Sequence, residues 1–253
     1  MSKYEKDILN AVNLHGRISV MELAQCLNVS DQTIRRIVKP LVDEGKIEKA
    51  HGALVSIQKV LDPPFFARMA TNRAAKVAIA NAVLDLIPDD ASIAIDTGST
   101  SGFVAQVLRA RKNLTVVTNS AFIAATLAME NGNRVFMAGT QLRNHDGAAF
   151  DRAAFDVIGK MSVDFSILSA SLVNPKRGFM VFEQCEVDMA VAMKTISERC
   201  FMAVDSTKFH ASGANPALRL PELLGRDLLI TDQAPASKFK DVIGQAKVVL
   251  ASH

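Results

Sequence analysis

The chain has 253 residues, enough for one large domain or for two modest domains that each bury a core. Hydrophobic residues make up 49% of it and charged residues 22%, a globular balance that excludes wholesale disorder. With 29 basic and 26 acidic residues, the net charge is only +3. Any contact with nucleic acid therefore has to come from a local basic patch.

The cysteines and the N-terminal segment indicate a reducing, aqueous compartment. Cys26, Cys185 and Cys200 lie far apart without a C-x-x-C pair, so we expect neither a disulfide framework nor a cysteine zinc site. The charged residues that follow Met1 are unlike a signal segment, and no run approaches the roughly 18 to 20 apolar residues of a membrane span. We expect a soluble cytoplasmic protein with no membrane contact, no cofactor and no metal site.

The N-terminal region begins with two predicted helices. Apolar residues recur at helical spacing over residues 8–14, and His15-Gly16 ends this first helix. Ser19 is the expected N-cap of a short helix over residues 20–27, and Glu22 completes a capping box with it. This second helix is too small to fold alone, so it has to pack on its neighbours.

A tight turn at residues 28–30 leads into a third predicted helix over residues 31–44, which Gly45 stops. Pro40 lies inside it and is expected either to kink the helix or to end it early. The alternating residues 46–55 then predict a short β-hairpin or wing.

The second and third helices with the tight turn between them form the pattern of a helix-turn-helix. In that motif the second helix enters the major groove, polar residues early in it reach base edges, and nearby cations contact phosphates. Ile34, Ile37 and Leu41 are expected to pack this helix on the first two. The alternative, a surface helix with ordinary charges, is less consistent with the capped preceding helix and the basic wing. The expected DNA contacts are Ser30, Gln32, Thr33, Arg35, Arg36, Lys39, Lys49 and His51.

Beyond an unpatterned stretch that contains Pro63 and Pro64, the chain changes to alternating strands and helices. We expect a DNA-binding domain over residues 1–57, a linker over 58–73 and an α/β domain over 74–253. The predicted helices are 74–87, 102–110 and 121–130, and the predicted strands are 92–96, 114–118, 134–138, 165–170, 201–205, 228–231 and 247–250. Such repeats predict a largely parallel sheet covered by helices.

The segment Asp96, Thr97, Gly98, Ser99 and Thr100 follows a predicted strand and precedes a helix. Free backbone amides at a helix start attract phosphate, and open α/β sheets bind ligands at the carboxyl ends of their strands. The alternative is that a hydroxyl in this segment merely caps the helix. The sequence favours a phosphate site.

Other polar residues also follow predicted strands. Thr118 and Asn119 repeat the arrangement and could bind sugar hydroxyls or cap the next helix. Arg143 could pair with an anion or simply be solvated, and Lys208 could help bind an anion or pair with Asp205. Glu183 is a further candidate at the ligand site.

Segments across nearly the whole chain resemble the DeoR-type family of bacterial sugar-metabolism regulators. They are Ser30–Arg36, Leu41–Ile47, His51–Ala53, Lys76, Ile79, Asp96–Thr100, Val117–Ser120, Gly139–Arg143, Glu186 and Asp205–Phe209. None is specific alone, but their order and spacing are. The family usually has Asp after Arg-Arg and a second glycine in the wing, where this chain has Ile37 and Ala53. This difference should blur operator preference without changing the fold.

The resemblance implies a winged helix-turn-helix domain and a sensor domain with the fold of ribose-phosphate isomerases and CoA-transferases, which binds a phosphorylated sugar metabolite. Three departures from the family pattern indicate a re-lined pocket. Thr140 replaces the second glycine of a Gly-Gly pair, Asp151 stands where glycine is common, and residues 169–173 differ from the usual Gly-Ala-Asp-Gly-Ile-like segment.

We therefore expect a repressor of a carbohydrate-utilisation operon that binds double-stranded operator DNA as a homodimer or homotetramer. The alternative is a sugar-phosphate isomerase with an accessory N-terminal domain, in which Asp96, Glu183 or Glu186 would act as the base. No histidine stands in a recognisable nucleophile–base arrangement, and no H-E-x-x-H spacing occurs, so we do not expect an enzyme.

Overall fold

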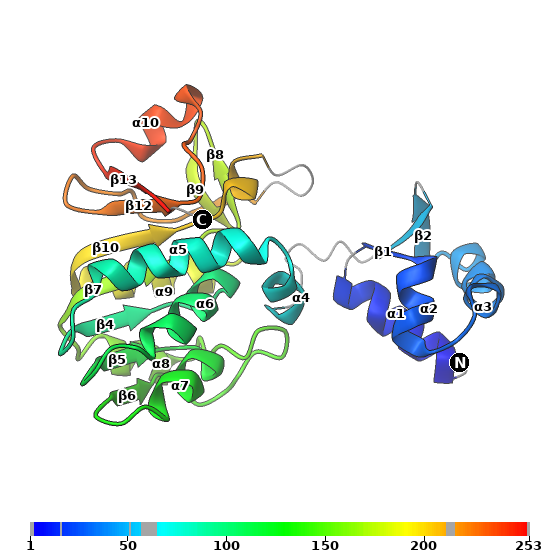
Figure 1. The fold of residues 1–253 in the computed structure, drawn as a ribbon, viewed down its shortest axis with the longest axis horizontal. Helices are drawn as coiled ribbons and strands as arrows, with labels where there is room; N and C mark the ends of the chain where they lie inside the picture. The colour runs from blue at the N-terminus through cyan, green and yellow to red at the C-terminus, as the bar shows by residue number, and fades with distance from the viewer. Residues whose placement is uncertain (1–2, 16, 51, 57–64, 211–215, 252–253) are drawn as a thin grey trace. The chain divides into compact units, whose positions relative to one another are not determined.

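The computed structural model describes residues 3–15, 17–50, 52–56, 65–210 and 216–251 (Figure 1). The chain forms two compact units, residues 1–67 and 68–253. Gly16, the expected boundary at residue 57 and the first half of the expected linker lie outside the described residues. The second half of that linker holds a helix, α4 (Phe65–Ala70), where the sequence suggested irregular chain. The helix forms where buried Phe65 and the partly buried Met69 give it an apolar side.

The first unit is a three-helix domain with a small sheet. Its elements are α1 (Lys3–His15), β1 (Arg17–Ser19), α2 (Val20–Leu27), α3 (Asp31–Asp43), β2 (Ile47–Ala50) and β3 (Ala53–Ser56). β3 lies between β1 and β2 and pairs antiparallel with both. Residues from all three helices and from the hairpin form one core. The predicted wing is therefore present, and β1 adds a strand to it that the sequence analysis missed.

Helix α3 forms as predicted at its start, and Pro40 does not end it. Ser30 is the N-cap, and its Oγ accepts a hydrogen bond from the Thr33 amide at 3.2 Å. The helix continues past Pro40 to Asp43, and Pro40 itself is exposed. The buried stripe differs by one position from the prediction, because Val38 is buried with Ile34 and Leu41 while Ile37 is only partly buried.

The second unit is built on a seven-stranded parallel sheet in the order β13-β12-β10-β7-β4-β5-β6. Its strands are β4 (Ser92–Ile95), β5 (Thr115–Thr118), β6 (Arg134–Met137), β7 (Val163–Leu168), β10 (Ser197–Ala203), β12 (Leu228–Thr231) and β13 (Lys247–Leu250). Its helices include α5 (Arg73–Leu86), α6 (Ser99–Leu108), α7 (Ala121–Ala128), α8 (Arg152–Ile158), α9 (Gln184–Thr195) and α10 (Lys240–Ile243). The parallel, helix-covered sheet is confirmed.

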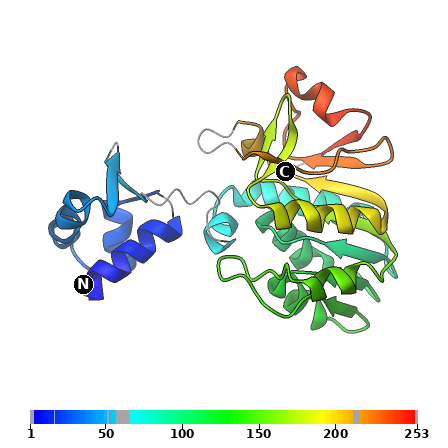
Figure 2. The ribbon, with the colours of Figure 1, turned by 180° about the vertical axis from the view of Figure 1, so that it is seen from behind.

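Successive side chains of a strand point to opposite faces of the sheet, and here both sets are largely apolar, so helices cover both faces. On one face α5, α6 and α7 bury residues such as Ile93 and Ile95, and on the other α8, α9 and α10 bury residues such as Ala94. Figure 1 shows α5 and α6 in front of the sheet, and Figure 2 shows the yellow helix α9 on the opposite face. None of the described helices is long and apolar enough to span a membrane.

A second, antiparallel sheet was not predicted from the sequence. It consists of β8 (Leu172–Asn174), β9 (Gly178–Val181) and β11 (Leu218–Arg219), with β9 in the middle. These strands are two to four residues long and carry almost no periodic signal. Two short 3-10 helices, η1 (Ser206–Phe209) and η2 (Ser237–Phe239), complete the unit.

Candidate functional site

Helix α3 presents most of the residues that the sequence predicted to contact DNA. Gln32, Arg35, Arg36 and Lys39 are exposed, and Lys49 is exposed on strand β2 of the wing. Neither arginine makes a hydrogen bond or ion pair with another described residue. Ser30 and Thr33 are used differently, because their hydroxyls form a 2.8 Å hydrogen bond within the cap of α3. His51 lies outside the described residues.

The second candidate site follows from the parallel sheet. β10, β7, β4 and β5 are consecutive neighbours, so the segments after their carboxyl ends lie along one edge. Those segments carry Asp205–Lys208, Ser169, Asp96–Thr100 and Thr118–Ser120 respectively. We call this edge the rim. It brings together residues that the sequence could only assign to separate strand ends.

At the end of β4, no described side chain caps the start of α6, and no described group accepts from its first amides. Gly98 is the N-cap residue, and the first backbone hydrogen bond of the helix runs from the Gly102 amide to the Gly98 carbonyl at 2.8 Å. The predicted alternative, a hydroxyl cap by Ser99 or Thr100, is therefore wrong. Both residues lie inside the first turn and are buried, and the Thr97 hydroxyl is buried without a hydrogen-bond partner among the described residues.

Asp96 holds this turn against the neighbouring strand. Its Oδ1 accepts a hydrogen bond from the Ser101 hydroxyl at 2.6 Å, and its Oδ2 accepts one from the Ser169 amide at 2.9 Å. Burial raises the pKa of Asp96 to about 7, although both hydrogen bonds act in the opposite direction. A side chain at Gly98 would place its Cβ 2.3 Å from the Ser169 hydroxyl. Gly98 is thus required for close packing of the turn.

At the end of β5, the sequence left open whether the polar residues cap the next helix or bind a ligand. Ser120 is the N-cap of α7, and the Thr118 hydroxyl accepts a hydrogen bond from the Ser120 amide at 3.1 Å. Asn119 is fully buried and does not cap the helix. Its Nδ2 donates to the Ala149 carbonyl at 3.1 Å, while its Oδ1 has no partner among the described residues. Asn119 Oδ1 is thus a buried acceptor at this strand end without a donor among the described residues.

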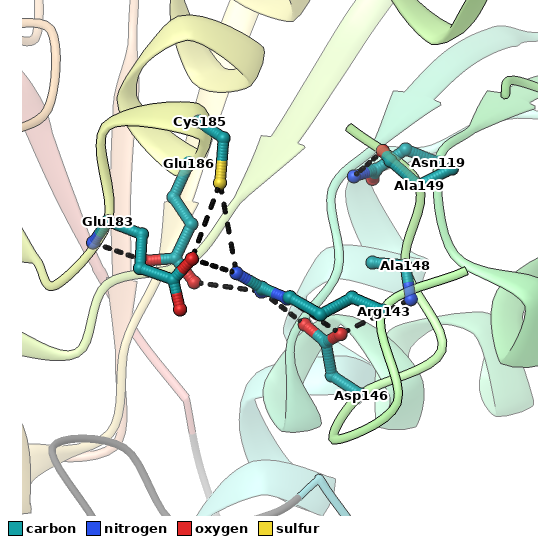
Figure 3. A network of polar contacts seen from close by, with 8 residues as sticks. All are labelled: Asn119, Arg143, Asp146, Ala148, Ala149, Glu183, Cys185 and Glu186. Atoms are coloured by element: carbon teal, nitrogen blue, oxygen red, sulfur yellow. Dashed lines mark hydrogen bonds and ion pairs between the residues drawn. The ribbon is translucent and has the colours of Figure 1, made fainter. Parts of the chain in front are cut away.

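Arg143 is enclosed by acidic side chains (Figure 3). Its Nε and Nη2 donate to the two oxygens of Asp146 at 3.1 and 2.5 Å. Nη2 also contacts Glu186, and Nη1 contacts Glu183, each at 3.0 Å. The guanidinium lies over the Phe150 ring with its carbon 4.4 Å from the ring centroid. Arg143 is therefore neither solvated nor free to bind an anion as it stands.

Two departures from the family pattern pair with each other in the loop that precedes Arg143. One oxygen of Asp151 accepts hydrogen bonds from the amide and the hydroxyl of Thr140, at 2.8 and 2.7 Å. The other oxygen caps α8 by accepting from the Ala154 amide at 2.9 Å. Hydrogen bonds from the Gln141 amide and from Thr140 hold the pKa of Asp151 below its usual range. Asp151 therefore holds the backbone of the Thr140 loop against the start of α8.

At the end of β10, Asp205 is tied to the residue before α5. Its Oδ1 accepts a hydrogen bond from Asn72 Nδ2 at 2.9 Å and another from the Thr207 amide at 3.1 Å, which starts η1. The alternative ion pair between Asp205 and Lys208 does not occur among the described contacts. A backbone hydrogen bond from the Lys208 amide to the Asp205 carbonyl joins these two residues, and the Lys208 ammonium has no partner among the described residues.

Lys76 is a buried cation beside this segment, and its role was not predicted from the sequence. It is 2% exposed, and its Nζ donates to the carbonyls of Arg68 and Thr71 at 2.5 and 2.7 Å, at the end of α4. Burial lowers the pKa of Lys76 to about 8, with the charges of Lys208 and Arg68 adding to the effect and that of Asp205 opposing it. Lys76 thus joins the carboxyl end of α4 to α5.

Lys76→Met should remove a pH-dependent part of the stability. In wild type, Lys76 is charged in both states below pH 8, but between about pH 8 and 10.5 only the unfolded chain keeps the proton. This residue therefore makes wild type more stable, relative to the variant, as pH rises through that window. Urea denaturation at pH 8 and pH 10 measures the difference, with the exposed Lys112→Met as the matched control. Parallel pH profiles for wild type and Lys76→Met would contradict the burial of this charge.

Sequence reasoning missed three residues that shape the rim. The Ser169 amide binds Asp96 from the neighbouring strand end, so nothing local marks it. Asp146 lies only three residues after Arg143 and binds it within one loop. The sequence offers Glu186 only as a residue of the family pattern and as a candidate base, although it lies three residues after Glu183 and accepts a hydrogen bond from the Glu183 amide at 3.3 Å. That Glu-x-x-Glu spacing at a helix start was a usable signal.

Comparisons with known proteins agree with the division into an N-terminal helix-turn-helix domain and a C-terminal α/β domain. Residues 5–60 match the DeoR-like helix-turn-helix domain, and residues 71–233 match the DeoR C terminal sensor domain. The chain is 31% identical over 236 residues to the glycerol-3-phosphate regulon repressor of Escherichia coli, covering 93% of this chain and 92% of that protein. It is 28% identical to the E. coli HTH-type transcriptional repressor CsqR, covering 95% and 91%.

A further relative has the opposite regulatory sign. The L-fucose operon activator of Haemophilus influenzae is 28% identical, with 92% of this chain and 93% of that protein covered. Among solved structures, a D-ribose-5-phosphate isomerase in complex with phospho-erythronic acid covers 54% of this chain and 53% of its own, at 16% identity and a TM-score of 0.40.

Proposed function

Because the chain belongs to the DeoR family of transcriptional regulators, we propose that it represses a carbohydrate-utilisation operon and that a phosphorylated sugar or related metabolite controls its operator affinity. Exposed cations on α3 and on the wing support the DNA-binding half of this proposal. Operators with two-fold symmetry need two copies of the reading helix, so the protein would act as a homodimer or homotetramer. It would do so in the cytoplasm.

The observation that carries the effector half is the start of α6. Its amides are not capped by a side chain, and Ser99 and Thr100 of its first turn are buried. The Thr97 hydroxyl just before the helix is buried without a hydrogen-bond partner among the described residues. Amides at a helix start carry partial positive charge and are suited to bind phosphate oxygens. We propose that the effector phosphate binds at Thr97–Thr100.

Of the two candidate cations, Lys208 is better suited than Arg143 to assist the phosphate. Arg143 already faces three carboxylates, so its positive charge is more than neutralised. Lys208 follows the end of β10 on the same rim, and its ammonium has no described partner. The positive charge of Lys208 helps to lower the pKa of the buried Lys76.

The raised pKa of Asp96 is the one observation that favours an isomerase, since a carboxyl that titrates near pH 7 suits acid–base chemistry. Both of its oxygens, however, accept hydrogen bonds that hold the turn before α6. The relatives named above are regulators of transcription. We therefore propose that the protein is not an enzyme.

The effector proposal predicts that binding depends on phosphate. A thermal-shift screen of phosphorylated sugars on the full-length protein selects a binder, since a ligand of the folded state raises the melting temperature. The first probe is glycerol 3-phosphate. Calorimetry then compares the binder with its dephosphorylated form, for which we expect at least about 100-fold weaker binding, because hydrogen bonds to a charged group contribute roughly 1.5–3 kcal/mol each.

Two outcomes would count against this reading. Equal affinity with and without phosphate would remove the phosphate site. Turnover of the bound compound, followed by NMR and abolished in Asp96→Asn, would support the isomerase instead.

A further inference from the structure

The rim next to Arg143 has a surplus of negative charge. One guanidinium faces Asp146, Glu186 and Glu183, whose side chains are 0%, 15% and 49% exposed. The two less exposed carboxylates fix Arg143 in place. Glu183 contacts Nη1 and accepts a weak hydrogen bond from the Cys185 thiol at 3.7 Å. It is half exposed, so it is the carboxylate that a ligand would meet.

A second observation, independent of these charges, shows what kind of group is missing. The Oδ1 of Asn119 is buried with no donor among the described residues. Its orientation is fixed, because Nδ2 donates to the Ala149 carbonyl and the Ala149 amide donates back to the Asn119 carbonyl at 2.8 Å. A buried acceptor without a donor is destabilising, because it has given up its hydrogen bonds to water without a replacement. The position therefore calls for a hydrogen-bond donor.

Asn119 and the acidic cluster belong to one place on the rim. A β-bridge pairs Leu142 with Ala149, so the segment that carries Arg143 lies against the residue that Asn119 contacts. In Figure 3 the Asn119 side chain extends from its strand end toward the side where α9 begins. Strand β5 also neighbours β4, whose end leads into the Thr97–Thr100 turn, and the charge of Glu186 reaches Asp96.

The groups at this end of the rim that are left to meet a ligand, which are the carboxylates of Glu183 and Glu186 and the Asn119 Oδ1, all accept hydrogen bonds. Hydroxyl groups of a ligand can donate to Asn119 Oδ1 and to the carboxylates of Glu183 and Glu186. A carboxylate or second phosphate on the ligand has no proton to donate, and it would add a like charge to the cluster.

Resting on the proposed function, we infer that the effector is a singly phosphorylated polyol or sugar whose hydroxyls donate to Asn119 and Glu183, and that Glu183 excludes ligands with a second anionic group. The phosphate would occupy the α6 start and the hydroxyl-bearing carbons would extend toward α9. Glu183 is thereby a specificity-determining residue.

The test uses alcohol and acid probes that differ only at the carbon opposite the phosphate. Glycerol 3-phosphate is compared with 3-phosphoglycerate, and glucitol 6-phosphate with 6-phosphogluconate. Calorimetry on the full-length protein should give at least about 30-fold tighter binding of the alcohol in the pair that binds, an amount that one unfavourable charge contact at an effective dielectric constant near 20 can supply.

Glu183→Gln removes one charge but keeps the shape of the side chain. It should reduce the preference for the alcohol at least about fivefold, mainly by improving binding of the acid. Its matched control is Glu222→Gln, a neutralisation at a residue that is 76% exposed and pairs with Arg219. This control should leave the preference unchanged.

The outcomes separate the two ideas. If the acid binds as well as the alcohol, or if Glu183→Gln leaves the ratio unchanged, the inference is wrong while the phosphate site stands. If no member of either pair binds and the wider screen of phosphorylated sugars finds no ligand, the proposed function fails and this inference fails with it.

Discussion

Replacing Arg35 and Arg36 together with alanine should weaken operator binding by about 100-fold or more. Both side chains are exposed in the first half of α3, beside the capped start that enters the major groove in helix-turn-helix proteins. An arginine that reads a base contributes about 1–3 kcal/mol, and a phosphate contact adds a salt-dependent term. The measurement is an affinity titration with DNA selected from a random pool by the full-length protein.

The single variants distinguish the two roles. Loss of the base-reading arginine should relax sequence preference. Loss of the phosphate contact should weaken all sequences alike and lower the salt slope by about one. Arg152→Ala is the matched control, because that side chain is 94% exposed on α8 of the other unit. A double variant that melts like wild type and still binds the selected DNA normally would show that α3 is not the reading helix.

Thr100→Glu should give a protein that binds operator normally and ignores the effector. Thr100 lies in the first turn of α6, within the proposed phosphate site, so a carboxylate added there would repel the phosphate. A ligand shifts an equilibrium only through unequal binding to the two states, and a ligand that no longer binds shifts nothing. For a repressor this means permanent repression. Operator-binding titrations with and without effector measure it.

Two further variants guard against a trivial loss of folding. Gln106→Glu adds the same charge at an exposed position of the same helix and should respond to effector like wild type. Thr100→Val keeps the shape but removes the hydroxyl, and should weaken effector binding only about tenfold, the loss of roughly one hydrogen bond to a charged group. With melting temperatures matched, normal effector-driven release by Thr100→Glu would refute the site assignment.

Signals that act within a few residues made much of the fold predictable from the sequence. The Ser19–Glu22 capping box and the Ser30 cap fix where two helices begin, and both are present. The buried runs at residues 92–95 and 228–231 are strands of the parallel sheet. Such signals depend on hydrogen bonds and periodicity within a single turn or strand, so they can be read without knowing the rest of the chain.

The sequence was less informative where a local rule had more than one outcome. Pro40 could have ended α3, but the packing of Val38 and Leu41 keeps the helix continuous to Asp43. Tertiary packing also placed α4 in a segment that reads as linker. In each case the burial of apolar side chains outweighed the local preference of the chain, which was to end the helix at Pro40 and to stay irregular at α4.

The chemistry of the rim was decided by the tertiary structure alone. Arg143 and Glu186 are 43 residues apart in the chain, yet their contact converts an expected anion-binding arginine into part of an acidic cluster. The Ala149 carbonyl accepts a hydrogen bond from Asn119 Nδ2, which fixes the amide with its Oδ1 buried and without a donor among the described residues. The sequence determined which polar groups follow each strand. Only the sheet order, by bringing distant loops together, decided which of those groups neutralise one another and which remain for a ligand, since charge and hydrogen bonding act over a few ångströms in space regardless of separation along the chain.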